Sequence, residues 1–326
     1  MELLSGPQAV AHAARAAGVG CVIGHDAVSK AARALKGETW ASELLDLHGD
    51  SATSAAAART LAGQRCLVEN AQSTKPLALA RLPVVCTSPE PKNWSIVLAP
   101  ANAQEALDDA ILAYALAEKS LLPATVVIDK LLVETSETVE IPPEKAVKSF
   151  LGALSLDKQH ARFARYDLEG CALAQRAMDA AKATIPKLSQ EWKKRFRRTL
   201  EPFEAFMVED AELAFVTYGS CSSNARLAVQ ALRQQGEKVG LLRLHVLRPW
   251  PEAELHAVLQ NVSRLAVVDG QISFGTWSKL YQGIKTWHAG FASDFIASDV
   301  LTAQDFIDIA HRLRAASAPE RVWMVR

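Results

Sequence analysis

Acidic and histidine side chains that could transfer protons gather just before an alanine-rich segment early in the chain. The stretch 43–63 carries Asp46, His48 and Asp50 ahead of the small-residue run 51–58. Carboxylates and imidazoles transfer protons near neutral pH when their surroundings adjust their pKa values. Acids followed by a helix are typical of a cofactor-binding fold that presents a carboxylate at a helix start.

Other candidate residues are expected in loops that follow strands, because open α/β sheets bind ligands at the carboxyl ends of their strands. None of these loops is a dinucleotide fingerprint, a phosphate loop, a serine elbow or a zinc-protease motif. Histidines at strand ends, here His25, His48 and His245, are more often structural groups than bases. The loop after Tyr218 could hold an anion or cap its own helix. The candidate loops begin at Gly24, Leu47, Glu69, Tyr218 and Val267.

The cysteines offer no metal-binding pattern. None of the five lies within three residues of another, whereas iron–sulfur clusters and zinc need closely spaced thiolates. We therefore expect buried, reduced thiols and no metal site in this chain. If the protein handles electrons, the metal centres are expected on another chain.

Bulk composition narrows the classes of protein further. Of 326 residues, 49% are hydrophobic and 22% charged, which predicts packed cores in two domains. Basic and acidic residues number 36 each, and this zero net charge disfavours a nucleic-acid or anionic-membrane partner. No apolar run is long enough to span a bilayer, and residues 1–20 lack a signal-peptide pattern, so a cytoplasmic location is expected.

The elements that must position these residues alternate along the first half of the chain. The middle helix is expected to have Asp50 or Ser51 as its N-cap and Gly63 at its end. The alternation predicts an α/β domain over residues 1–142 with a parallel sheet covered on both faces. The sequence pattern indicates strands at 19–26, 65–70, 82–88 and 123–133, and helices at 8–18, 50–63 and 102–120.

A charged helical connector is expected over residues 143–207. Its basic run 193–198 fits a solvated helix face or a partner-binding patch. Residues 208–326 form a second α/β domain, whose last helix begins with a capping box of Thr302 and Asp305. The predicted fold is thus α/β, with two doubly wound domains joined by a helical connector. The second domain has predicted strands at 211–220, 238–251 and 264–270, and helices at 222–236, 252–263, 273–287 and 302–316.

Motifs in the second domain resemble the α subunit of pyruvate:ferredoxin oxidoreductase and its 2-oxoacid relatives. That family has a glycine–serine pair after the first strand, a KVGLL strand, an Arg-Pro-aromatic-Pro turn, and an aspartate followed closely by Ile-Ser-Phe-Gly. The segments 101–118, 121–152 and 191–212 resemble its first domain and connector, so the resemblance covers nearly the whole chain. The motifs are matched by Gly219–Ser220, Lys238–Leu242, Arg248–Pro251, and Asp269 with Ile272–Gly275.

The resemblance implies a first domain of the thiamine diphosphate pyrimidine-binding type and a second of the transketolase C-terminal type. A β-type subunit would supply the diphosphate half of the site, with Mg, at an interface with this chain. A γ-type subunit and a ferredoxin-like subunit would complete the assembly. The implied reaction is oxidative decarboxylation of a 2-oxoacid to an acyl-CoA, with electrons passed to iron–sulfur clusters on partner chains. His48, Asp50 and Gln72 are the residues implied to contact the cofactor.

One departure from the family pattern falls in the stretch 43–63. The family has Glu-His-Ser-Ala before a small-residue helix ending in Ala-Gly, and its glutamate is the acid–base group at the aminopyrimidine. Aligned from the Ala-Gly end, this chain has Asp50 in the place of the histidine and Gly49 in the place of the glutamate. Glycine cannot transfer a proton. The residues that could replace the glutamate are Asp46, His48 and Asp50.

Two further departures concern the substrate side. Val28 replaces the threonine of the family's Gly-Tyr-Pro-x-Thr-Pro loop, and segment 71–100 lacks part of a helix and loop that the family carries, although Gln72 keeps a family glutamine. The expected function is therefore an α-type subunit of a multi-subunit 2-oxoacid oxidoreductase. The alternative is a catalytically degenerate scaffold in such a complex. A live site remodelled for a bulkier, aromatic 2-oxoacid also stays open, whereas a free-standing enzyme is disfavoured.

Overall fold

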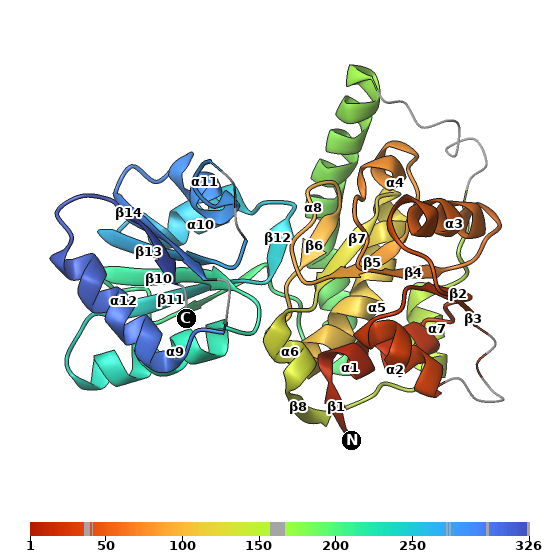
Figure 1. Ribbon diagram of the computed structural model, residues 1–326, viewed down its shortest axis with the longest axis horizontal. Coiled ribbons are helices and arrows are strands. Elements are labelled where there is room, and N and C mark those ends of the chain that lie inside the picture. The colour runs from red at the N-terminus through yellow and green to blue at the C-terminus, as the bar shows by residue number, and fades with distance from the viewer. Residues whose placement is uncertain are drawn as a thin grey trace. The chain divides into compact units, whose positions relative to one another are not determined.

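A computed structural model describes residues 1–35, 40, 42–156, 167–271, 273, 275–297 and 300–324. Ile272 and Phe274 of the predicted motif therefore lie outside the described residues. The chain divides into two compact units, both α/β, which confirms the predicted fold class (Figure 1). Unit 1 comprises Met1–Glu201 with Val246–Trp250, and unit 2 comprises Pro202–His245 with Pro251–Arg326.

Unit 1 contains a seven-stranded sheet in the order β12-β6-β7-β5-β4-β2-β3. Neighbouring strands are parallel except for β12, which is antiparallel to β6. A separate antiparallel pair joins β1 (Glu2–Ser5) to β8 (Ser136–Val139). The strands of the main sheet are β2 (Cys21–Ile23), β3 (Glu43–Leu45), β4 (Cys66–Glu69), β5 (Val85–Ser88), β6 (Ile96–Leu98), β7 (Ala124–Val127) and β12 (Val246–Arg248).

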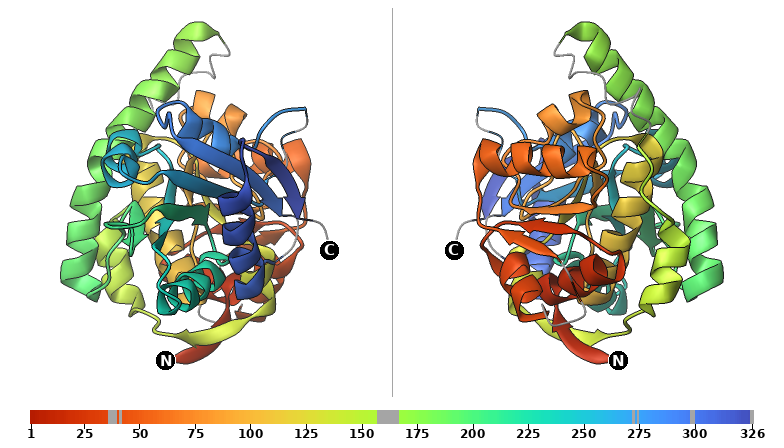
Figure 2. Two further views of the ribbon diagram at one scale, coloured as in Figure 1. Left: turned by 90° about the vertical axis from the view of Figure 1, so that its left-hand side faces the viewer. Right: turned by 90° about the vertical axis from the view of Figure 1, so that its right-hand side faces the viewer.

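Helices cover both faces of this sheet. Successive side chains of a strand point to opposite faces, so each strand packs against helices on both sides. Val22 packs in the core cluster shared with α1 and α5, whereas Cys21 and Ile23 pack in the cluster shared with α3. Figure 2 (right) shows β2 and β3 between α3 on one side and α1 and α2 on the other. The helices are α1 (Gly6–Ala16), α2 (Ala27–Leu35), α3 (Gly49–Leu61), α4 (Lys75–Leu79), α5 (Ala103–Ser120), α6 (Lys130–Glu134), α7 (Glu144–Leu151) and α8 (Leu168–Phe196).

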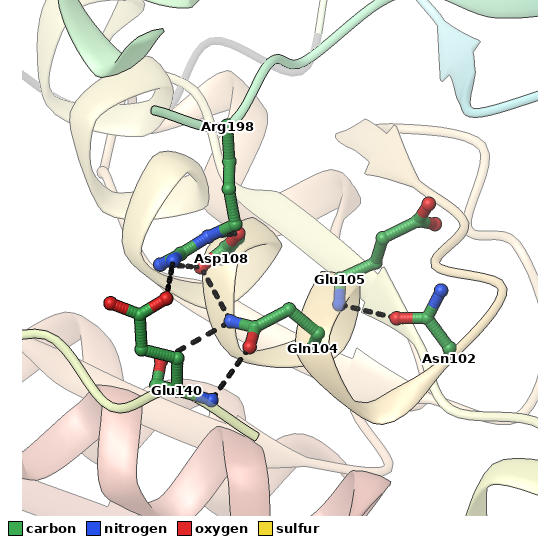
Figure 3. Close-up of polar contacts among 6 residues, drawn as sticks. All are labelled: Asn102, Gln104, Glu105, Asp108, Glu140 and Arg198. Atoms are coloured by element: carbon green, nitrogen blue, oxygen red, sulfur yellow. Dashed lines mark hydrogen bonds and ion pairs between the residues drawn. The ribbon is translucent and has the colours of Figure 1, made fainter. Parts of the chain in front are cut away.

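A polar network fixes the chain after α8 to α5 (Figure 3). The Arg198 guanidinium donates to both carboxylate oxygens of Asp108, at 2.5 and 3.0 Å, and to Glu140 at 3.2 Å. Gln104 donates to Asp108 at 3.3 Å and accepts from the Glu140 N–H at 2.7 Å. Burial raises the pKa of Asp108 to about 6, although Arg198 opposes the shift. The connector is therefore held by a partly buried ion pair as well as by apolar packing.

Unit 2 contains a six-stranded sheet in the order β15-β14-β13-β10-β11-β9, parallel except for the edge strand β9. Helices α9 and α12 lie on one face and α10 and α11 on the other (Figure 1). The strands are β9 (Phe203–Phe206), β10 (Leu213–Tyr218), β11 (Val239–Leu244), β13 (Arg264–Asp269), β14 (Phe291–Ala297) and β15 (Arg321–Met324). The helices are α9 (Ser222–Gln234), α10 (Glu252–Leu259), α11 (Lys279–Lys285) and α12 (Ala303–Ala315).

Several element boundaries differ from the sequence prediction. The strand expected over 123–133 ends at Val127, because Asp129 caps a new helix, α6, by accepting from the Leu132 N–H at 3.1 Å. The helix expected over 273–287 begins only at Lys279, after its N-cap Ser278. The predicted capping box of α12 is confirmed by the reciprocal bonds of Thr302 and Asp305.

Candidate functional site

The carboxyl ends of β4, β2 and β3 lie next to one another in unit 1, and their loops form the candidate site. Ile23 on β2 is level with Leu45 on β3 and Val68 on β4. The Gly24 N–H donates to the Leu45 carbonyl at 2.9 Å, so the ladder continues past the end of β2. The loops that carry the sequence-predicted residues therefore start from one edge of the sheet.

A buried carboxylate at the end of β4 holds the first of these loops. Glu69, only 7% exposed, accepts from the N–H groups of Asp26 at 2.9 Å, Val28 at 2.6 Å and Ser29 at 3.1 Å. These donors lie at the start of α2, where unpaired N–H groups favour a negative charge. Gly24 makes room, because a Cβ there would lie 2.6 Å from the Glu69 Cβ. Both Glu69 oxygens thus stabilise the loop, a role that the sequence analysis missed.

Gly49 and Gln72, two residues singled out from the sequence, lie together. Gly49 has a left-handed backbone with φ of +56°, and a Cβ there would lie 3.1 Å from the Gln72 Oε1. His48 is the N-cap of α3, so the expectation of Asp50 or Ser51 as N-cap is wrong. Gly49 is the first residue of α3, and its positive φ is a conformation that glycine adopts more readily than other residues. Asp50 is exposed in the first turn of α3.

His48 also lies against His25 from the neighbouring loop. Their ring centroids are 4.1 Å apart with an interplanar angle of 78°. Asp46 is 3.7 Å from the His48 Nε2, and Asp26 is 3.4 Å from the His25 Nε2. All four of these side chains are more than two-fifths exposed. The candidate site is therefore a solvent-facing group of imidazoles and carboxylates.

The cavity beside this group is small. It has a volume of about 150 Å³ and is lined by residues that include Val28, Glu69 and Asn70. Ligand pockets for cofactor-sized molecules are usually about 300–1,000 Å³. Val28 in this lining is 2% exposed and offers no hydroxyl to a ligand.

Cys21 and Cys66 lie opposite each other on the neighbouring strands β2 and β4, but no cysteine belongs to a group of three possible metal ligands among the described residues. Cys21, Cys66 and Cys86 are buried, Cys171 and Cys221 are half-buried, and none of the five is in a disulfide. Burial raises the pKa of Cys86 to about 12, so this thiol stays protonated at neutral pH.

In unit 2, polar residues of the loops predicted as candidate sites make hydrogen bonds within the unit. The Ser222 hydroxyl, in the loop after Tyr218, donates to the Gly219 carbonyl at 2.6 Å. Asp269 accepts from the Tyr218 hydroxyl at 2.7 Å and from two backbone N–H groups, of Gln271 and Leu280. Burial raises the pKa of Asp269, and these donors oppose the shift. His245 is buried at the end of β11.

Two family models match consecutive parts of the chain. Residues 57–208 match the model described as pyruvate flavodoxin/ferredoxin oxidoreductase, thiamine diphosphate-binding. Residues 211–297 match pyruvate:ferredoxin oxidoreductase core domain II. Both models describe parts of one oxidoreductase family, and together they span most of this α/β chain. The chain belongs to the pyruvate:ferredoxin oxidoreductase family and is of its α-subunit type, which confirms the resemblance seen in the motifs.

Known relatives agree with this assignment. The pyruvate synthase subunit PorA of Methanothermobacter thermautotrophicus is 34% identical over 202 residues, which are 56% of this chain and 51% of the relative. The ketoisovalerate oxidoreductase subunit VorA of Pyrococcus abyssi is 32% identical over 204 residues, 56% of this chain and 50% of the relative. The chain thus spans about half the length of the curated relatives it matches.

The fold also agrees with a solved structure. A 2-oxoglutarate:ferredoxin oxidoreductase from Magnetococcus marinus superposes with a TM-score of 0.70 over 95% of this chain and 65% of its own. At 14% identity this likeness concerns the fold. The described residues contain no helix long and apolar enough to cross a membrane.

The first family match begins inside α3, at residue 57. His25, Asp46, His48 and Gly49 all precede it, and of the three residues predicted to contact a cofactor only Gln72 falls within it. The loops that carry the histidines thus precede the matched residues, whereas Glu69 and Gln72 of the candidate site lie within them.

Proposed function

We propose that this chain is an α-type subunit of a multi-subunit 2-oxoacid oxidoreductase complex, in which it supplies the domain fold but not the family's acid–base carboxylate. The substrate class is a 2-oxoacid and the acyl acceptor is coenzyme A. Partner chains of β, γ and ferredoxin-like type would carry the diphosphate and Mg half of the thiamine site and the iron–sulfur clusters. The absence of closely spaced cysteines from this sequence supports that division of labour.

Gly49 is the main support for the proposal that this chain does not supply the acid–base carboxylate. Counted back without a gap from Ala62–Gly63, the family glutamate falls at this residue, which has no side chain and whose φ of +56° is unfavourable for other residues. Glu69, a buried carboxylate at the same edge of the sheet, already accepts three backbone N–H groups. The residues described here do not fit the family's acid–base site for an aminopyrimidine. We infer no proton-transfer step for this chain.

A second candidate is a remodelled, active site that uses Asp50. It is favoured by the position of Asp50, which is exposed in the first turn of α3 and adjacent to Gly49. The two candidates differ in what removal of this carboxylate does to 2-oxoacid oxidation by the complex.

The test uses the native complex, purified through a tag on this chain. Asp50→Ala is compared with Asp308→Ala, which removes an exposed aspartate from α12. We expect iron–sulfur partner chains to co-purify and both variants to keep wild-type rates of 2-oxoacid-dependent electron transfer. We also expect less than one thiamine diphosphate per copy of this chain, or a second α-type chain that retains the glutamate.

A loss of roughly 10²–10⁴-fold in Asp50→Ala alone would establish the remodelled active site instead. Recovery of the chain without any partner would overturn the subunit assignment.

A further inference from the structure

Two histidines and an aspartate from neighbouring loops bring metal-binding atoms together at the edge of unit 1. One ligand atom each of His25, Asp46 and His48 lies within 4.8 Å of the other two. His25 follows β2, whereas Asp46 and His48 follow β3. The sequence did not predict this group, because its members are separated in the chain and form no spaced motif.

The backbone holds the two loops in place. Pairing of β2 with β3 fixes His25 beside the start of the second loop, and the Gly24 N–H bond to Leu45 extends that pairing. His48 has an extended backbone, so Asp46, two residues earlier, is placed to share its side of the chain. The His48 carbonyl accepts from the Ser51 hydroxyl at 2.6 Å, which fixes it at the start of α3.

We propose that His25, Asp46 and His48 form a binding site for a divalent transition-metal ion of the zinc class. Two imidazoles and one carboxylate suit Zn²⁺, Co²⁺ or Ni²⁺, whereas Mg²⁺ and Ca²⁺ prefer oxygen ligands alone. Three protein ligands leave a coordination position to water, as in catalytic zinc sites. The side chains of His48 and Asp46 are 62% and 61% exposed, so an ion can reach them from solvent.

The separations need only a small adjustment. Zinc binds nitrogen and carboxylate oxygen at about 2.0–2.2 Å, so two of its ligand atoms can be at most about 4.4 Å apart. The ligand atoms now lie within 4.8 Å of one another, and small rotations of these exposed side chains would bring them to binding distance without a change of backbone.

A carboxylate next to the group provides the outer support that metal-binding histidines usually have. Asp26 lies 3.4 Å from the His25 Nε2, and the Asn70 amide donates a hydrogen bond to Asp26. Asp26 can thus orient the His25 ring while its other nitrogen binds the ion. The proposal does not depend on the proposed function, because metal binding belongs to this chain alone.

The experiment measures Zn²⁺ binding to the full chain, free of any histidine tag, by competition with a chromophoric chelator. Co²⁺ absorption spectra report which ligands are bound. The variants are His25→Ala, Asp46→Ala and His48→Ala. The matched control is His311→Ala, because His311 is an exposed histidine 3.9 Å from a single carboxylate, that of Glu237.

We expect one Zn²⁺ per chain. Each cluster variant should weaken binding at least as much as the 10–100-fold that loss of an outer partner typically costs, and His311→Ala should match the wild type. The three side chains are exposed, so all variants should keep the wild-type unfolding temperature without metal. Equal Zn²⁺ affinity in the wild type and all cluster variants would overturn the proposal, as would a Co²⁺ spectrum dominated by thiolate absorption.

Discussion

At the scale of single residues, the backbone at Gly49 disfavours any side chain larger than that of glycine. Its φ of +56° lies in the left-handed region, and the Gln72 amide occupies the space beside it. A glutamate at this position would adopt a strained backbone and push the amide aside. The helix start has thus adapted to glycine, with His48 as the residue that precedes it.

This account predicts the effect of a small substitution. Gly49→Ala should lower the free energy of unfolding by at least about 1–2 kcal/mol, because a left-handed backbone costs that much for a residue with a Cβ and the close contact with Gln72 adds to it. Chemical denaturation of the full chain measures the change. Gly63→Ala is the matched control, since Gly63 has φ of +84° with open space around it and would pay the backbone cost alone.

The contact with Gln72 is tested in the same experiment. In a Gln72→Ala background, the penalty of Gly49→Ala should fall toward that of Gly63→Ala. If Gly49→Ala is as stable as the wild type, the backbone does not require glycine, and this position would not disfavour a larger side chain.

Residue roles at the site could be predicted from the sequence only in part. His48, Gly49 and Gln72 were found by type and position, and the structure places them at one edge. Glu69 was not recognised, because its partners are backbone N–H groups of a loop some forty residues earlier. The approach of His25 to Asp46 and His48 depends on strand order, which local sequence does not specify.

At the scale of elements, long periodic segments were predicted well and short ones poorly. The helices α5 and α12 lie where the sequence pattern places them. The first is a long apolar helix buried on all sides over residues 106–117, and the second buries a single face. The strands β3 and β6, of three residues each, are too short to show a period. The strands β14 and β15 were missed as well, so unit 2 has more strands than expected.

The buried contact between α5 and the connector predicts a pH dependence of stability. The pKa of Asp108 is raised to about 6, from 3.8 for an ordinary aspartate. Between these values the folded chain holds a proton that the unfolded chain releases, so the Asp108 contribution to stability falls as pH rises toward neutrality. From about pH 5 to about pH 7 the loss should be about 1 kcal/mol, at 1.36 kcal/mol per pKa unit.

Asp108→Asn removes this titration and should flatten that part of the pH profile measured by urea unfolding. Asp179→Asn, an exposed aspartate on α8, checks that loss of any carboxylate does not have the same effect. A profile unchanged by Asp108→Asn would mean that Arg198 keeps Asp108 ionised throughout this range.

At the scale of the whole molecule, the chain does not divide at one point along the sequence. The apolar run 238–251, expected as one strand, splits at His245: β11 belongs to the sheet of unit 2 and β12 to that of unit 1. Both halves of this run have the apolar pattern of a buried strand, so the sequence pattern does not specify which sheet each half joins. Residues 246–250 lie inside the range 208–326 predicted for the second domain but belong to unit 1.

This connectivity predicts where a mutation in the second half of the chain acts. Val246 in β12 and Val239 in β11 are both fully buried, but Val246 pairs with Leu98 in unit 1 and Val239 with Leu213 in unit 2. Each truncation to alanine should cost about 2 kcal/mol, because it leaves a cavity in a packed core. Amide hydrogen exchange should show Val246→Ala lowering protection in β6, and Val239→Ala lowering it in β10. Equal loss in β10 from both variants would mean that β12 is energetically part of unit 2.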